Sequence, residues 1–367
     1  QLIPGSGSSA GLRDKAGNAL GSSGYVPNGS TYSRRFSVEE ATEQAPPPSP
    51  WDTSVTTTSV GAAAKGYPES RHTVAADADG DTVVVWIAPD AQGRDTVYFR
   101  LFNASGTAAN NTTAVSPLDT GAQYANSAQR LAAVACDPDG DFVVTWTAYD
   151  NSGGQDVYAR RFNAAGTPQG AAFRVNAFTQ NVQKWSSVAM DAEGDFVIVW
   201  SSFGQEDPTL GTGYGVYARR YDAFGTPQVE YDTASAGTPK NGEFQVNVMT
   251  AGDQRFPSVA MDAEGDFIVT WTSSASGAGD DIRYRGFYAD GSPMYDSLAN
   301  QTGSLYGEGI ANESQGGQRR YSDVAISPAG SQFVITWTSA GQDTSGDGVY
   351  TRVFQRTDKQ LPRQVYN

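Results

Sequence analysis

One pattern of about sixty residues occurs five times along this chain. The decapeptide SVAMDAEGDF stands at both 187–196 and 258–267, and each copy places a tryptophan at the end of a β-branched, aromatic run. These tryptophans, spaced 60, 54, 71 and 66 residues apart, are Trp86, Trp146, Trp200, Trp271 and Trp337. A repeat of this length indicates an architecture in which each unit buries its apolar face only against its neighbours.

Each copy predicts four short antiparallel strands. The inner strand is an alternating run that starts near residues 72, 132, 186, 257 and 322, as expected for a half-buried strand. An Asp-x-x-Gly turn leads into the run that ends at the tryptophan, and this second run predicts a strand covered on both faces. A Gly- and Asp-rich loop, a third strand, a second tight turn in most copies and a short fourth strand complete the unit.

Four antiparallel strands per unit, with no predicted helix, favour an all-β fold: a five-bladed β-propeller of four-stranded antiparallel blades. A row of immunoglobulin-like sandwiches is the weaker alternative, because each sandwich needs about seven strands and ~100 residues. We expect the lone segment Ser54–Val60 to close the ring as the outer strand of the last blade. The alternative is that Gln360–Asn367 supplies that strand.

Composition narrows the class of partner. The net charge is −15, with only five lysines and one histidine, so the chain lacks the basic stripe that binds nucleic acid or anionic membranes. It has one cysteine, which excludes an intrachain disulfide framework. No apolar run is long enough to cross a bilayer. We expect a secreted or cell-surface, extracellular protein of bacterial type, without membrane insertion.

Two stretches carry a resemblance to known families. Gly11–Leu20 and Tyr32–Val38 resemble the C-terminal strands of bacterial Ig-like domains, and the repeats resemble the propeller-type repeats of large secreted bacterial surface proteins, whose signature is D-x-x-G-D-F-V-V-x-W. The resemblance implies a piece of a longer chain. The predicted plan is an Ig-like remnant at 1–40, a Pro-rich linker at 41–53, the propeller at 54–358 and a tail at 359–367. The fifth copy departs, with Ser327–Ser331 replacing the acidic turn.

The acidic turns present three carboxylates within five residues, which is a candidate calcium site because hard cations prefer oxygen ligands. The alternative is purely structural, since Asp first and Gly fourth are what the turn itself demands. The candidate metal-binding residues are Asp77, Asp79, Asp81, Asp137, Asp139 and Asp141. No other cofactor is indicated.

The long loops between the second and third strands should share one face with those that lead into the next copy. Loops held on a rigid scaffold favour binding sites, and the longest inserts are 202–214, 229–242 and 290–318. The candidate partner-binding residues are Glu206, Asp207, Tyr214, Tyr231, Tyr295 and Tyr306. Trp51 and Trp185 lie outside the repeat register and are candidate exposed platforms.

The third strand carries an arginine at the same place in every copy. We expect a structural ladder in which each guanidinium stacks on a ring or pairs with a carboxylate, and the register tryptophans to be core. The arginines are Arg100, Arg160, Arg219, Arg285 and Arg352. Cys136 takes a core place in the repeat, and His72 is alone, without a triad or zinc motif around it.

Every residue kept in register has a packing or turn explanation, so we expect no catalytic residues. The chain is predicted to be a non-catalytic structural, adhesive or assembly module that contacts proteins or surface glycans through its long loops. One alternative is a lectin-like carbohydrate-binding propeller. Another is a polysaccharide lyase or glycosidase with carboxylates in the central channel.

Overall fold

The structure is a computed structural model, and it describes residues 73–91, 93–115, 129–149, 154–206, 213–231, 239–240, 242–274, 279–294, 307–313, 317–341 and 346–356. These residues form only β-strands, turns and loops. The predicted all-β class is therefore confirmed. No helix in this part of the chain is long and apolar enough to span a membrane.

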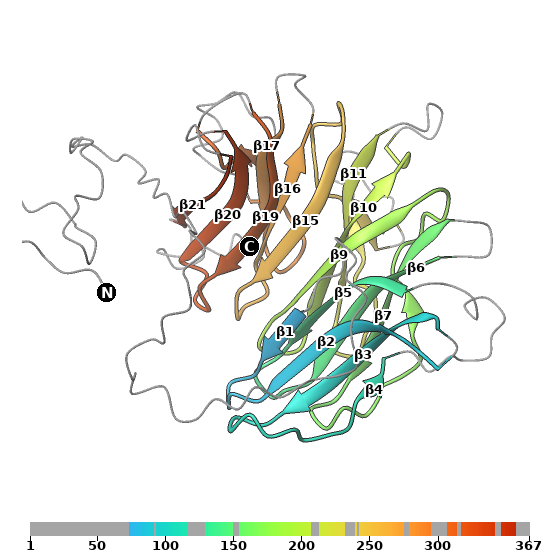
Figure 1. Ribbon diagram of the computed structural model, residues 1–367. Helices are drawn as coiled ribbons and strands as arrows, with labels where there is room; N and C mark the ends of the chain where they lie inside the picture. The colour runs from blue at the N-terminus through green and yellow to red at the C-terminus, as the bar shows by residue number, and fades with distance from the viewer. Residues whose placement is uncertain are drawn as a thin grey trace, which may run out of the picture. The chain divides into compact units, whose positions relative to one another are not determined.

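Five antiparallel sheets follow one another along the chain (Figure 1). The first consists of β1 (Thr73–Ala76), β2 (Thr82–Pro89), β3 (Asp95–Phe102) and β4 (Thr113–Ala114). The second consists of β5 (Gln129–Cys136), β6 (Phe142–Tyr149), β7 (Gln155–Phe162) and β8 (Phe173–Arg174). The third consists of β9 (Gln183–Met190), β10 (Phe196–Phe203), β11 (Tyr214–Tyr221) and β14 (Glu243–Gln245).

The remaining sheets keep the same order. The fourth consists of β15 (Gln254–Met261), β16 (Phe267–Ser273), β17 (Asp281–Phe287) and β18 (Glu308–Ile310). The fifth contains β19 (Arg319–Ile326), β20 (Gln332–Ala340) and β21 (Asp347–Gln355). A separate hairpin, β12 (Glu230–Tyr231) with β13 (Pro239–Lys240), lies in the insert of the third repeat. Four sheets thus have the predicted four strands, and the described part of the fifth has three.

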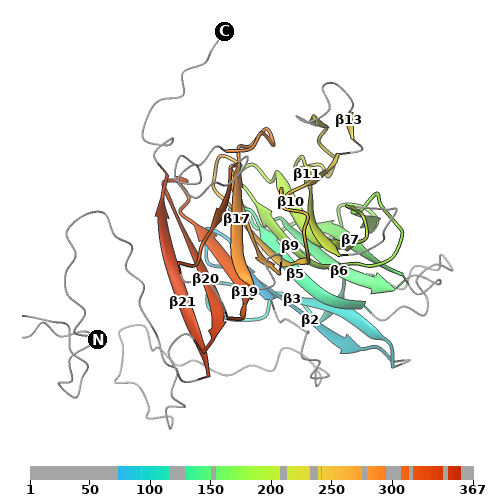
Figure 2. The same ribbon diagram turned by 90° about the horizontal axis from the view of Figure 1, so that it is seen from above.

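Neighbouring sheets pack face to face, as in a propeller. Four apolar clusters lie at the four successive boundaries, and each joins residues of two consecutive sheets, for example Phe99 with Phe142 and Ile268 with Ile335. The inner strands β1, β5, β9, β15 and β19 lie beside one another in that order (Figures 1 and 2). This arrangement of five sheets is the propeller-like fold that the repeats predicted.

The second strand of each sheet is the most buried one in the middle of the array. In β6, β10 and β16 almost every residue is buried, which explains their unbroken apolar and Thr-rich sequence. In β20 buried residues alternate with partly exposed ones, and Val74 of β1 is 64% exposed. The first and last sheets therefore each keep one face that the described residues do not cover.

The acidic turns bring consecutive sheets into close contact. Asp137 Oδ1 accepts hydrogen bonds from the backbone N–H groups of Asp139 and Asp141, at 3.0 and 2.9 Å. Gly140 has a φ of +86°, and a Cβ there would lie 2.9 Å from Oδ2 of Asp77 in the preceding sheet. Glycine is required both by its backbone conformation and by this contact. The predicted turn chemistry is confirmed, with an additional contact between sheets.

Several expected segments fall outside the described residues. They are the Ig-like remnant at 1–40, the linker at 41–53, the closing segment Ser54–Val60 and the C-terminal tail at 359–367.

Candidate functional site

The inner strands share one irregularity that the sequence pattern did not reveal. In β5, β9, β15 and β19 the pairing with the next strand shifts register, so that two residues face the repeat tryptophan. Such a β-bulge bends the strand and redirects a side chain. Each of these strands consequently begins three residues earlier than predicted, at Gln129, Gln183, Gln254 and Arg319.

At each bulge one large side chain occupies a left-handed backbone conformation. The residues are Leu131, Trp185, Phe256 and Tyr321, with φ values of 58, 58, 57 and 56°. Bulky residues rarely adopt this conformation, which costs of order 1 kcal/mol or more each, and such strain concentrates at functional sites. This conformation recurs on the inner strands of four successive repeats, so it belongs to the repeat architecture.

The strained residues form a continuous aromatic row across three blades. The ring centroids of Trp185 and Phe256 are 4.3 Å apart, and those of Phe256 and Tyr321 are 5.0 Å apart. Tyr214, at the start of β11, lies 5.3 Å from Trp185. Tyr321 is 53% exposed, and Trp185 and Phe256 are half-buried. We call Trp185, Phe256 and Tyr321 the aromatic row.

Two members of the aromatic row, Trp185 and Phe256, line a cavity of about 310 Å³ to which all five inner strands contribute. Thr73 of β1, Leu131 of β5, Trp185 of β9, Phe256 of β15 and Asp323 of β19 line it. The cavity therefore lies where the five repeats meet, which is the position of the central channel in a propeller. Concave sites that combine apolar side chains with a few placed polar groups are typical of ligand binding.

The polar groups of the cavity are hydroxyls and one carboxylate. Ser258 Oγ donates a 2.6 Å hydrogen bond to Oδ1 of Asp323. Ser186 also lines the cavity, and its Oγ lies 3.1 Å from Oγ1 of Thr145. Asp323 is exposed to solvent, and it supplies the carboxylate among the described lining residues.

The arginine ladder is a structural connection between sheets. Arg160, Arg219, Arg285 and Arg352 each donate from Nη1 to a backbone carbonyl of the preceding repeat, at 2.9, 2.8, 2.8 and 3.1 Å. The acceptors are Val115, Val175, Val246 and Ala311. Each guanidinium also lies over the ring two residues further along its own strand, 5.1–5.7 Å from the centroid, as Arg100 does over Phe102. The acceptor at Nη1 is a carbonyl rather than the carboxylate that we expected as one option.

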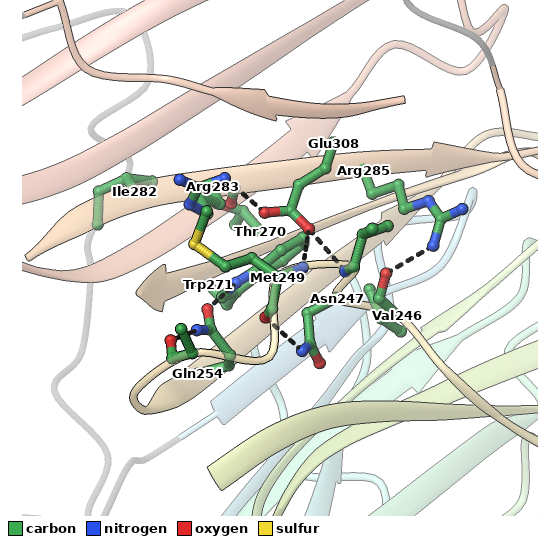
Figure 3. A network of polar contacts seen from close by, with 12 residues as sticks. Val246, Asn247, Met249, Gln254, Thr270, Trp271, Ile282, Arg283, Arg285 and Glu308 are labelled. Carbon is green, nitrogen blue, oxygen red and sulfur yellow. Dashed lines mark hydrogen bonds and ion pairs between the residues drawn. The ribbon is translucent and has the colours of Figure 1, made fainter. Parts of the chain in front are cut away.

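Figure 3 shows this arrangement between the third and fourth repeats. Arg285 reaches the Val246 carbonyl, while Glu308 accepts from the backbone N–H groups of Val248 and Met249 at 2.7 and 3.2 Å. Glu308 also pairs with Arg283 at 2.6 Å. The buried Trp271 donates from its indole N–H to Gln254. The contacts of Arg285 and Glu308 with the third repeat join two blades. None of these side chains lines the cavity.

The register tryptophans are core residues, as predicted, with exposed fractions of 0–5%. Four of them stack on a tyrosine of the next strand, with centroids 6.1–6.5 Å apart. In the fourth repeat Arg283 faces Trp271 instead. Cys136 packs against the core, and burial raises the pKa of its thiol to about 11. It is therefore protonated at neutral pH and unsuited to act as a nucleophile.

In the acidic turns, carboxylate oxygens already serve the backbone. Asp77 Oδ1 accepts from the N–H groups of Asp79 and Asp81 at 3.0 and 2.9 Å, and Asp81 Oδ1 accepts from Ala104 at 2.8 Å. The turn at Asp137 has the same bonds, and Asp141 accepts from Ala164. Within the described ranges no cluster of three or more His, Cys, Asp or Glu side chains could hold a metal ion. The geometry favours the structural interpretation of these turns.

The long-loop candidates are only partly described. Tyr214 contacts the aromatic row through Trp185, whereas Asp207, Tyr295 and Tyr306, together with His72 and Trp51, lie outside the described residues. For Tyr231 the backbone, in β12, is described but the side chain is not. The structure therefore brings one of the predicted partner-binding residues, Tyr214, to the candidate site.

Glu206 accepts a hydrogen bond that an aspartate of the third strand accepts in two other repeats. Asn176 and Asn312 each donate to an aspartate of the third strand, Asp156 and Asp281. In the third repeat Gly215 takes that place, and Glu206 of the preceding loop accepts from the equivalent Asn247. Burial raises the pKa of Glu206 to about 7, and the hydrogen bonds from Asn247 and Gln245 lower it in part. Glu206 thus ties a long loop to the sheet.

We predicted Trp185 as a platform because it lies outside the register, but we missed Phe256, Tyr321 and Asp323. A signal was present: three of the four residues at the bulges are preceded by Gln and a basic residue, in Gln129-Arg130-Leu131, Gln183-Lys184-Trp185 and Gln254-Arg255-Phe256. The bulge interrupts the alternation of apolar and polar residues, so these residues were not predicted as part of a strand.

No protein-family model and no curated protein matches this chain. Among solved structures, it is similar to an α-L-arabinofuranosidase from Lactobacillus brevis, with 13% identity, a TM-score of 0.41, and coverage of 78% of this chain and 91% of that one. A family PL25 ulvan lyase has 10% identity, a TM-score of 0.47, and coverage of 80% and 68%. An N-acetylgalactosamine deacetylase from F. plautii has 10% identity, a TM-score of 0.40, and coverage of 84% and 94%.

These comparisons correct two expectations. From the repeat pattern we predicted a non-catalytic structural, adhesive or assembly module and no enzyme. The similar solved structures instead include glycoside hydrolases, a polysaccharide lyase and a deacetylase. The expectation failed because it assumed that a symmetric repeat leaves no polar, unsymmetric site, whereas Asp323 lines the cavity from one blade only.

Proposed function

We propose that this protein binds a carbohydrate chain at the cavity formed by its inner strands, with sugar rings seated on the aromatic row. The observation that supports this is the left-handed bulge repeated at Trp185, Phe256 and Tyr321, which brings three rings into contact, two of which, Trp185 and Phe256, line the cavity. Aromatic side chains offer a large, rigid apolar face at low entropic cost. The hydroxyls of Ser186 and Ser258 and the Asp323 carboxylate suit the hydroxyl groups of a sugar.

Replacing the row tests the proposal. We expect Trp185→Ala and Tyr321→Ala each to weaken glycan binding by about tenfold or more, since stacking of this kind contributes about 0.5–1.5 kcal/mol per ring pair beyond area burial and the lost apolar contact area adds to it. Binding is measured on a glycan array and then by calorimetry with the best ligand. Phe224→Ala is the control, because Phe224 is 82% exposed in a turn remote in sequence from the lining residues. Equal binding by wild type and both row variants would refute the proposal.

A second candidate function is chemical conversion of the bound glycan, with Asp323 as the group that transfers a proton. The supporting observation is that Asp323 lies in the cavity lining and is oriented by the 2.6 Å hydrogen bond from Ser258. Glycoside hydrolysis ordinarily uses a pair of carboxylates, and the described lining supplies one, so binding remains the main proposal.

Asp323→Asn distinguishes the two functions. If Asp323 is catalytic, the variant retains glycan binding within a few-fold and loses at least about a hundredfold in product formation, which matches the usual contribution of general acid–base catalysis. Product formation is followed by reducing-end assay and by absorbance of unsaturated sugars. Unchanged turnover would exclude the role of Asp323.

We also propose that the ring is closed by Ser54–Val60 and that the protein works outside the cell. In the alignment of the repeats, Val60 takes the position of Val115, Val175 and Val246, whose carbonyls accept the hydrogen bonds of the arginine ladder. Arg100 is the ladder arginine of the first repeat, and Val60 is the aligned residue that precedes it. The Val60 carbonyl would then be the acceptor for Arg100. An acidic chain with a single cysteine suits an extracellular location.

A further inference from the structure

A row of cations accompanies the aromatic row. The residue immediately before each strained aromatic is basic: Lys184, Arg255 and Arg320. Lys184 Nζ lies 4.0 Å from the ring centroid of Trp185 and 5.6 Å from that of Tyr214, and Arg255 Cζ lies 5.8 Å from that of Phe256. Each ring of the aromatic row is therefore preceded by a cation along its strand, in a chain whose net charge is −15.

The ion pairs of the two arginines are partly exposed. Arg255 lies 3.4 Å from Asp253, with side chains that are 30% and 33% exposed, and Arg320 lies 3.3 Å from Asp280, with 43% and 15% exposed. Pairs in contact with solvent contribute about 0–1 kcal/mol. They hold the guanidinium groups in place and leave them able to exchange partners with a ligand.

The packing of the row does not itself require positive charge. The rings contact one another directly, and a neutral sugar needs only rings and hydroxyl partners. Lysine and arginine recognise carboxylates and sulfates through charge-assisted hydrogen bonds, and arginine does so with a planar fork. Asp323, the carboxylate of the cavity lining, lies two residues beyond Tyr321 along β19.

We infer that the ligand is an acidic polysaccharide, whose sugar rings lie on Trp185, Phe256 and Tyr321 and whose carboxylate or sulfate groups are held by Lys184, Arg255 and Arg320. This inference rests on the proposed glycan-binding function. Uronate and sulfate share the chemistry that the cations recognise, and separate polymers distinguish them.

The test compares three polymers at fixed salt: a polygalacturonate, a sulfated galactan and a neutral galactan. We expect the wild-type chain to bind at least one acidic polymer about tenfold more tightly than the neutral one, and the preference to shrink as NaCl rises. The double variant K184Q/R320Q is expected to lose that preference. Arg174→Gln is the matched control, since its side chain is also 43% exposed and paired with an aspartate, but it lies on the outer strand β8.

The outcomes separate the two claims. Binding of the neutral polymer as tightly as the acidic ones, or a preference unchanged in K184Q/R320Q, overturns the inference and leaves the glycan-binding proposal standing. No binding of any polymer overturns both. If the double variant unfolds, as judged by circular dichroism, the single Lys184→Gln variant replaces it, and loss of preference relative to Arg174→Gln remains the supporting result.

Discussion

At the scale of single residues, burial and position decide what each charged side chain does. Arg285 and Glu308 are fixed by backbone partners between two blades, while Arg255 and Arg320, which directly precede Phe256 and Tyr321, form partly exposed ion pairs. Glu206 is the clearest case of a carboxylate whose protonation the fold controls, because burial raises its pKa to about 7.

Glu206 predicts a pH dependence of stability. Its pKa in the folded state lies above the unfolded value of 4.5, so the folded state binds the extra proton. Its contribution is fully present below pH 4.5 and is lost as pH rises to about 7. We expect Glu206→Gln to flatten this fall and to be more stable than wild type at pH 8 by about 1 kcal/mol, after discounting for solvent screening.

The measurement is the free energy of unfolding in urea at pH 5 and pH 8 for both proteins. Asp191, whose pKa burial raises to about 6, contributes with the same sign in both, so the difference between the two slopes isolates Glu206. Parallel pH profiles for wild type and variant would contradict the assignment.

At the scale of the strand, two devices repeat from blade to blade. The third strand carries an arginine that bonds to the preceding sheet, and the inner strand carries the bulge opposite the tryptophan. The first device was visible in the sequence as a register residue, although its carbonyl acceptor was not. The second was hidden, because a bulge shifts the alternation from which strands are recognised.

The arginine ladder predicts a stability effect. Arg219→Met keeps most of the side-chain volume but removes the 2.8 Å bond to the Val175 carbonyl, so we expect a loss of about 1–3 kcal/mol in the free energy of unfolding. Arg174→Met, on the outer strand β8, is the control and should change it by less than about 0.5 kcal/mol. Equal effects of the two variants would mean that the carbonyl bond does not stabilise the boundary between sheets.

At the scale of the whole molecule, four boundaries between the five sheets have an apolar core. The first and last sheets expose valines on their outer faces, with Val74 at 64% and Val353 at 54%. Closure of the ring would cover these faces, whereas an open array would leave them in water.

Val353→Asp therefore tests closure. In a closed ring the charge would enter an apolar boundary, and we expect a loss of about 2 kcal/mol or more in the free energy of unfolding. Val229→Asp is the control, because Val229 is equally exposed, at 54%, in the insert of the third repeat. If both variants are as stable as wild type, the ring is open at this boundary.

The repeat, the all-β class, the turn positions and the buried tryptophans could all be predicted from the sequence. These follow from local chemistry: an Asp-x-x-Gly turn and a β-branched run specify their own conformation. The candidate site, in contrast, became visible only in the folded chain. Trp185, Phe256, Tyr321 and Asp323 are 71, 65 and 2 residues apart in the chain, and they meet because successive blades pack their inner strands together. No local pattern encodes that meeting, because it depends on contacts between repeats.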